Sequence, residues 1–161
     1  MDLIEYKFNP HQSWIKLDKN DYSNYAVVQI SEAEIVSAYK IGSLYNFSNT
    51  VVLYNYGKND GFLSDLEASY NELQHSIEEQ DELGVFPVYW ESFGDNKMLS
   101  ILKLITHPVM NIVDIFFEYN DDMYCFHTYI KSEEKKLDIT NLSAHYPNIR
   151  HIINEINNLQ N

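Results

Sequence analysis

Residues 111–131 have the sequence NIVDIFFEYNDDMYCFHTYIK, and this stretch decides the predicted fold. Two segments rich in β-branched and aromatic residues, 111–119 and 123–131, flank the polar triplet Asn-Asp-Asp. β-Branched and aromatic residues favour strands, whereas Asn and Asp tolerate the backbone of a tight turn. The stretch therefore predicts a β-hairpin of two antiparallel strands.

Apolar segments on the N-terminal side of this hairpin predict more strands. Pro87 lies within one of them and has no amide hydrogen to donate, so we expect that strand at a sheet edge or with a bulge. The expected strands lie at residues 3–8, 26–30, 44–56, 85–91 and 98–105, and a short strand or turn is expected at 14–17.

Capping boxes, in which a glutamate follows a serine by three residues, begin two expected helices. The boxes at 31–34 and 64–67 predict helices over 31–40 and 64–80. A third helix is expected over 147–159, where apolar residues recur at the spacing of one helix face.

Short turns between neighbouring strands, rather than strict alternation of strands and helices, indicate the fold class. The sequence predicts an α+β fold with a mainly antiparallel sheet covered by two or three helices. We expect the sheet within residues 44–131, with the helices at 64–80 and 147–159 packed on it. Because the chain has no repeat and no Pro- or Gly-rich linker, residues 1–161 are expected to form a single domain.

The formal net charge is −13, from 24 Asp and Glu against 11 Lys and Arg. This sign disfavours nucleic acid and favours a basic protein partner; alternatively, the charge only keeps the protein soluble. The N-terminal residues MDLIEYKF lack the basic start of a signal peptide, and no stretch has the ~18 apolar residues of a membrane span. Together with the single cysteine, Cys125, these features predict a cytoplasmic protein without membrane association.

The acidic block at 59–96 contains ten carboxylates and no Lys or Arg. Negative side chains at the C-terminal end of the helix expected there oppose the helix dipole, so their position is locally unfavourable. Such a placement indicates a use in steering a basic partner. The predicted partner-binding residues are Glu72, Glu78, Glu79, Asp81 and Glu82.

Sequence patterns for cofactors and metals are missing. The five glycines do not form a phosphate-binding loop, and no His-Glu-x-x-His occurs. Glu72 and His75 form one Glu-x-x-His, whereas di-iron sites on helices need two. His145 and His151 either share a site near the last helix or form a pH-sensitive surface pair. We therefore expect no cofactor and no metal.

Three residues of the hairpin are candidates for chemistry, although no catalytic residue is assigned. Cys125 and His127 are two apart on one strand, so their side chains share a face. They are either a nucleophile and its base, at a long Cα separation of about 6–7 Å, or a buried apolar residue beside a histidine. Asp114 is a candidate functional carboxylate if its face is buried, and an ordinary surface residue if that face is exposed.

The run VVLYNYGKNDGFLSDLEASYNELQHSI at 51–77 resembles the strand, turn and helix of the PsbP-like, DcrB-like bacterial family. The later segments VFPVYWESFGDNKMLSILKL, NIVDIFFEYNDDMYCFHTYI and NIRHIINEINNL resemble the strand meander and closing helix of that family. The resemblance covers residues 44–159, is one of pattern and order, and implies no catalytic motif. It points to binding rather than catalysis, as does a comparison with small acidic bacterial proteins that neutralise toxins.

The sequence thus favours a non-enzymatic protein-binding protein of an adaptor, chaperone or immunity type, which engages a basic partner through an acidic face. The alternative is a small enzyme or ligand-binding domain with a cleft on the strands at 98–131.

Overall fold

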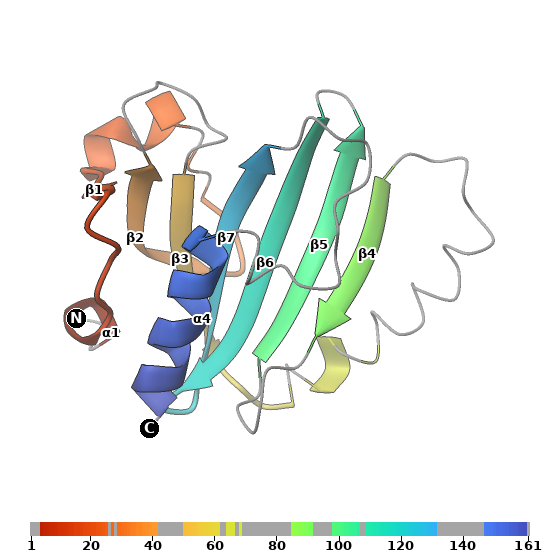
Figure 1. Cartoon of the computed structure of the whole chain (residues 1–161). Coiled ribbons are helices and arrows are strands. Elements are labelled where there is room, and N and C mark those ends of the chain that lie inside the picture. Colours follow the sequence, from red (N-terminus) through yellow and green to blue (C-terminus); the bar gives the residue numbers. More distant parts are fainter. Residues whose placement is uncertain are drawn as a thin grey trace.

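In the part of the chain that the structure describes, seven strands form one sheet with the order β1-β2-β3-β7-β6-β5-β4 (Figure 1). The computed structural model describes residues 4–25, 27, 29–41, 50–61, 64–66, 68, 85–91, 98–106, 109–131 and 147–160. The strands are β1 (Trp14–Lys16), β2 (Glu34–Ile41), β3 (Thr50–Lys58), β4 (Val85–Glu91), β5 (Met98–Thr106), β6 (Val109–Tyr119) and β7 (Asp122–Lys131). The helices are α1 (Ile4–Lys7), the 3₁₀ helix η1 (Lys19–Tyr25) and α4 (Pro147–Gln160). All pairings of these strands are antiparallel, which confirms the predicted α+β fold with a mainly antiparallel sheet.

The hairpin of β6 and β7 lies in the interior of this sheet, between β5 and β3. Asn120 and Asp121 have φ angles of 50° and 66°, the left-handed values that a two-residue hairpin turn requires. The turn sets the register, in which Tyr119 pairs with Asp122. The hairpin prediction is confirmed.

The strand β4 forms one edge of the sheet, and its register with β5 shifts between Pro87 and Tyr89. Proline cannot donate a ladder hydrogen bond, so it is tolerated at edges and bulges. The structure shows both features that Pro87 predicts.

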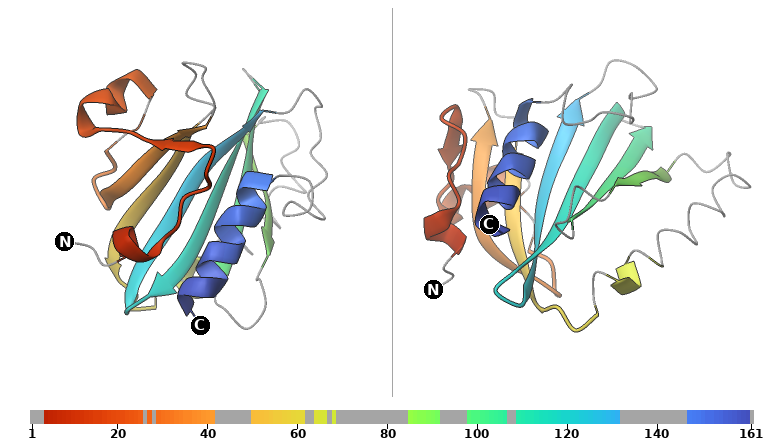
Figure 2. Two further views of the ribbon diagram at one scale, coloured as in Figure 1. Left: turned by 60° about the vertical axis from the view of Figure 1, so that its left-hand side comes forward. Right: turned by 60° about the horizontal axis from the view of Figure 1, so that its bottom comes forward.

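One face of the sheet, here called the helix face, is covered by α4 and the N-terminal segment (Figure 2). The apolar stripe of α4 lies on the sheet, which explains why the predicted helix at 147–159 is stable there. Under it, the Phe117 ring stacks on the rings of Tyr124 and Phe126, with centroids 5.6 Å apart in each case. The buried residues of the helix face are Ile4, Phe8, Trp14, Tyr39, Val51, Leu53, Val113, Ile115, Phe117, Tyr119, Tyr124, Phe126, Ile149, Ile152, Ile153 and Ile156.

The opposite face, here called the loop face, carries the side chains that alternate with those of the helix face. It is contacted by residues from the segment 17–33 and by Leu66. Its buried apolar residues are Leu17, Tyr25, Val27, Ala33, Ala38, Val52, Tyr54, Phe116, Met123 and Cys125.

Two strands predicted near the N-terminus are wrong. Residues 3–8 were expected as a strand, but Ile4–Lys7 form α1. This short helix brings Ile4 and Phe8, four residues apart, onto the helix face, where both are buried. The second wrong strand is 26–30, of which the described residues 27, 29 and 30 lie outside any strand.

The helix predicted over 31–40 is also wrong, because that stretch contains β2. Ser31 and Glu32 form a turn instead of a helix cap. A register shift between Ile35 and Ser37 interrupts the strict alternation that marks a strand in a sequence. Pairing of β2 with both β1 and β3 outweighs the local capping signal.

The remaining strand and helix positions are confirmed as far as the described residues reach. The strand expected at 44–56 is β3, although residues 42–49 lie outside the described part. Of the helix expected at 64–80, residues 64–66 and 68 are helical and the others lie outside the described residues. A search of the described helices finds none with the length and apolar character needed to span a membrane.

Candidate functional site

A polar cluster lies on the loop face where β6 and β7 pair. Asp114 is opposite His127 across the two strands, and His127 Nδ1 forms a hydrogen bond with Asp114 Oδ1. The Cys125 thiol contacts the same carboxylate oxygen, with Sγ 3.9 Å from Oδ1. Asp114 is only 8% exposed, so the buried alternative is correct for this carboxylate.

The geometry does not favour Cys125 as a nucleophile. A thiol nucleophile needs a base within hydrogen-bond distance to take up its proton. Here the carboxylate of Asp114 lies between the two candidates, because Cys125 and His127 both contact its Oδ1 atom. Cys125 is 1% exposed and packs among apolar side chains, so the second alternative, a buried apolar residue, describes it better.

The Asp114–His127 pair has the form of an imidazole oriented by a carboxylate. An ionised carboxylate only accepts hydrogen bonds, so Nδ1 is the donor in this pair. The side chains of Asp114 and His127 are 12% and 21% exposed. The loop face thus presents a partly exposed imidazole held by a more deeply buried acid.

Two tyrosines of β3 border this pair. The Tyr54 ring meets the His127 ring edge-on, with centroids 6.2 Å apart. The Tyr56 ring lies 5.7 Å from that of Phe116 on β6. Aromatic rings therefore flank the polar cluster on its β3 side.

Tyr56 lies in an environment that opposes negative charge on its hydroxyl. Burial is the largest cause and raises the pKa of Tyr56 above its ordinary value. Further contributions in the same direction come from Cys125, Asp114, Tyr54 and Glu32. The Tyr56 hydroxyl therefore stays neutral at physiological pH, next to a region of negative potential.

A bulge in β3 sets the position of Tyr56. The register with β7 shifts between Asn55 and Lys58. Gly57 has a φ of 85°, and its amide donates to Asn55 Oδ1 at 2.7 Å. Asn55 Nδ2 in turn donates to Asp122 Oδ2 at 3.3 Å, which ties the bulge to β7. Because a bulge re-aims the side chains of its strand, it accounts for the place of Tyr56 on the wall of a pocket.

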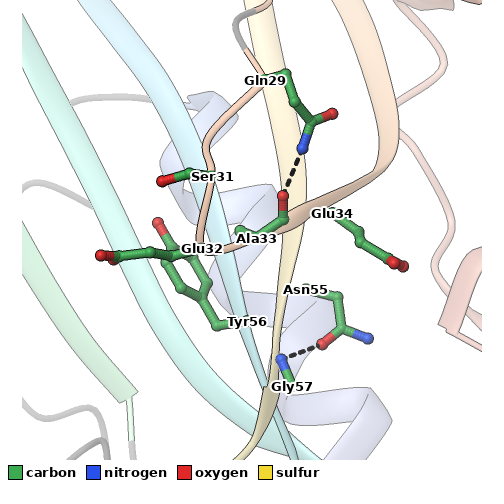
Figure 3. A pocket seen from close by; sticks show the side chains of 8 residues that line it. All are labelled: Gln29, Ser31, Glu32, Ala33, Glu34, Asn55, Tyr56 and Gly57. Atoms are coloured by element: carbon green, nitrogen blue, oxygen red, sulfur yellow. Dashed lines mark hydrogen bonds between the residues drawn. The ribbon is translucent and has the colours of Figure 1, made fainter.

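This pocket, here called the Tyr56 pocket, lies between the segment 29–34 and the C-terminal part of β3 and has a volume of about 440 Å³ (Figure 3). Gln29 Nε2 donates to Ala33 O at 2.6 Å, and Ala33 N donates to Ile30 O at 3.2 Å. The buried Ala33 side chain anchors the segment on the loop face. The wall of the pocket is thus held by hydrogen bonds and by apolar packing. The lining residues are Gln29, Ser31, Glu32, Ala33, Glu34, Asn55, Tyr56 and Gly57.

Two glutamates give the Tyr56 pocket its charge. In Figure 3, Ser31, Glu32 and Tyr56 point to one side of the segment 29–34, and Glu34 points to the other. Both glutamates are exposed, and within the described part of the chain neither forms a hydrogen bond or an ion pair. The lining residues include no Lys or Arg. The pocket is therefore polar, negatively charged and accessible to solvent.

None of the five residues that the sequence predicts for partner binding lies in the described part of the chain. The following lie outside the described residues: Glu72, His75, Glu78, Glu79, Asp81, Glu82 and His145.

His151 lies on α4 and contacts the N-terminal segment. Its Nε2 atom is 2.7 Å from the carbonyl oxygen of Asn9, and its ring lies 5.2 Å from that of His11 in an edge-to-face arrangement. The described ring neighbours of His151 are thus Phe8, His11 and Trp14, none of which the sequence indicated.

Sequence reasoning also missed the Tyr56 pocket, because the segment 29–34 was expected to pass from a strand into a helix. One signal was available in the sequence. Gly57 interrupts an otherwise apolar and aromatic run, and an isolated glycine in a strand often marks a bulge.

Comparison of the chain with models of protein families and with curated proteins gives no match. A search of the described residues finds no group of three or more His, Cys, Asp or Glu side chains arranged to hold a metal ion.

Proposed function

We propose that this protein is a non-enzymatic binding protein that engages a basic partner protein through an acidic surface. The observation that carries this proposal is the Tyr56 pocket, whose lining includes the exposed Glu32 and Glu34 and no Lys or Arg; Glu34 also lines a second pocket, with Lys16 and Lys19. The formal net charge of −13 has the same sign. A surface of one sign attracts a partner of the opposite sign and raises its rate of association.

This site differs from ordinary surface charge because it is concave. Isolated surface carboxylates usually serve solubility alone. Glu32 instead shares a hollow with Ser31 and the Tyr56 ring on one side of the segment 29–34, and recognition sites commonly combine such a hollow with a few convergent polar groups. The acidic block at 59–96 follows β3 directly in the sequence, and we propose that it contributes to the same acidic surface.

An adaptor, chaperone or immunity-type role in the cytoplasm belongs to the same proposal, because each of these roles consists of binding another protein. The relation to the PsbP-like, DcrB-like family stays a prediction, which the order of strand, meander and closing helix supports.

The test begins with capture of partners from a lysate of the native cell, followed by binding kinetics with the purified partner. The double variant Glu32→Gln/Glu34→Gln removes the charge of the pocket. The matched control Asp18→Asn/Asp21→Asn removes the same charge beside and within η1. We expect the pocket variant to associate more slowly than the control, with a weaker dependence on salt. Equal rates for the two variants would reduce the pocket to a part of the general charge.

The acidic block is tested in the same assay by neutralising Glu78, Glu79, Asp81 and Glu82 to Gln or Asn. Association is expected to slow and dissociation to change less, because long-range attraction acts mainly on the encounter. An unchanged association rate at low and at physiological salt would remove the block from the binding surface.

The alternative function, a small enzyme, is favoured by one observation, the Asp114–His127 pair. An imidazole held by a buried carboxylate is a usual form of general base. If His127 is such a base, a turnover assay with candidate substrates will lose its activity in His127→Gln, whereas partner binding will not change. If His127 is structural, no substrate will be turned over by the wild type.

A further inference from the structure

We infer that the Tyr56 pocket receives one arginine side chain of the basic partner. Because this arginine belongs to the partner, the inference rests on the proposed function. It specifies which side chain of the partner makes the anchoring contact. The residues that carry the inference are Glu32, Ser31 and Tyr56, which line the pocket on the same side of the segment 29–34.

The lining of the pocket offers hydrogen-bond acceptors. Gln29 Nε2 donates to Ile30 O at 3.1 Å and to Ala33 O at 2.6 Å, which holds the segment in place, and its amide oxygen points away from Ser31 and Glu32 (Figure 3). Glu32 contributes two carboxylate oxygens, and Ser31 adds a hydroxyl on the same side (Figure 3). A ligand that supplies several donors and a positive charge complements this set.

The buried carboxylate near Tyr56, that of Asp114, is negative like the carboxylate of Glu32. Asp114 is buried, and its electrostatic effect reaches the Tyr56 hydroxyl, as does that of Glu32. A charge in a partly desolvated place acts more strongly than one in open water. Both carboxylates therefore favour a cation over a neutral or anionic ligand at this wall.

The aromatic wall favours guanidinium over ammonium. Guanidinium is planar, is weakly hydrated, stacks on aromatic rings and forms paired hydrogen bonds with a carboxylate. Tyr56 supplies a ring and Glu32 a carboxylate on the same side of the segment 29–34. Lysine has a compact, strongly hydrated charge and cannot form this paired contact.

A second pocket of similar size shows what a poor arginine site looks like in the same chain. Its volume is about 420 Å³, and its lining includes Glu5, Asp18 and Glu34 together with Lys16 and Lys19. Lys16 Nζ already pairs with Glu5 Oε1 at 2.5 Å. Its carboxylates thus have cations of the chain beside them, whereas the lining of the Tyr56 pocket has none.

The experiment is an NMR titration of the full chain, labelled with ¹⁵N, with N-acetyl-arginine methylamide as the probe. The isosteric citrulline amide, which is neutral, and the corresponding lysine amide are the comparison ligands. We expect saturable shifts of backbone amides in 29–34 and 55–58 with the arginine probe. The affinity of the citrulline probe is expected to be lower than that of the arginine probe by about tenfold or more. The lysine probe is expected to bind more weakly than arginine.

Variants test the carboxylate of Glu32 and the ring of Tyr56 separately. Glu32→Gln and Tyr56→Leu should each weaken binding of the arginine probe by roughly tenfold, whereas Tyr56→Phe, which keeps the ring, should bind nearly as wild type. Asp21→Asn, an equal charge change in η1, is the control and should bind as wild type. The amide spectrum of each variant shows whether it is folded.

Three outcomes would overturn the site: no saturable shift in 29–34 and 55–58, equal binding of arginine and citrulline probes, or wild-type binding by Glu32→Gln. These results leave the proposed function open to its own kinetic test. Conversely, saturation of the pocket by the arginine probe supports the site even when no basic partner is captured from the cell.

Discussion

On the helix face, α4 packs its apolar stripe against stacked aromatic rings; on the loop face, buried apolar residues give way to an acid, an imidazole and a thiol. Burial of apolar area is the main source of folding stability, whereas a buried ionic pair is often no more stabilising than apolar residues of the same volume. The helix face is therefore expected to supply most of the stability. The loop face gives up part of that stability for polar groups, and such groups are where function is best sought.

The largest effect that this comparison predicts is at Phe126. Its side chain is 0% exposed, stacks on Phe117 and contacts the tilted ring of Phe8, so Phe126→Ala removes a large ring from the helix face. We expect a loss of roughly 3–5 kcal/mol in the free energy of unfolding, measured by urea denaturation followed by circular dichroism. Ile15→Ala, at a position that is 52% exposed, is the control and should change stability by about 0.5 kcal/mol or less. A loss below about 1 kcal/mol for Phe126→Ala would contradict the assignment of this face as the main core.

The next effect concerns the Asp114–His127 pair and tests the loop face. His127→Ala leaves a buried carboxylate without this partner, and we expect a loss of roughly 1–3 kcal/mol. The double variant Asp114→Val/His127→Leu replaces both groups by apolar ones and should recover much of that loss. The measurement is a thermodynamic cycle of unfolding free energies that includes both single variants. Additive single effects would show that the two side chains do not stabilise each other.

The hairpin and the edge strand could be predicted from the sequence because their signals are local. Asn120 and Asp121 can adopt the left-handed backbone of a tight turn, and Pro87 restricts its strand to an edge or a bulge. The apolar stripe of α4 is likewise contained within one helix. In each case, residues close in sequence determine the outcome.

The N-terminal region could not be predicted because its structure depends on partners far away in the chain. The segment 31–34 has the pattern of a capping box, yet pairing with β1 and β3 converts the following residues into β2. Residues 3–8 alternate weakly, but α1 forms because Ile4 and Phe8 pack on the helix face. Local propensity is a weak prior that such tertiary contacts override.

Only part of the candidate site could be predicted, because the rest again depends on contacts between residues that are distant in the sequence. The sequence indicates that Cys125 and His127 share a face, because alternation along a strand is a local rule. It does not indicate that Asp114 lies opposite His127, since the register of β6 and β7 has to be known first. Nor does it place Tyr56 in a pocket with Glu32, because the wall of that pocket comes from a turn that was expected to be helical.

A smaller effect on stability is expected at Gly57. A substitution there tests the backbone of the bulge without changing the packing of the loop face. With a φ of 85°, this position is strained for a residue with a Cβ atom, although a Cβ built there meets nothing within 4 Å. Gly57→Ala should therefore lower stability by about 1–2 kcal/mol through the backbone alone. Gly57→Asn, which tolerates left-handed φ better, is the control and should lose less. Equal losses from Ala and Asn, measured by urea denaturation, would count against backbone strain as the cause.

The smallest effect is the dependence of stability on alkaline pH at Tyr56. Because the folded-state pKa of this hydroxyl is raised, the unfolded chain releases its proton first, at about pH 10, while the folded chain keeps it. The contribution of Tyr56 to stability is thus fully present below about pH 10 and is lost as the pH rises above that value. We expect Tyr56→Phe to lose less unfolding free energy than wild type between about pH 8 and about pH 10.5, because phenylalanine has no proton to release. Tyr6→Phe, at a position that is 64% exposed, is the matched control and should follow wild type. If all three proteins lose stability in parallel, Tyr56 is as accessible to water as Tyr6, and the aromatic wall of the pocket is not a desolvated surface.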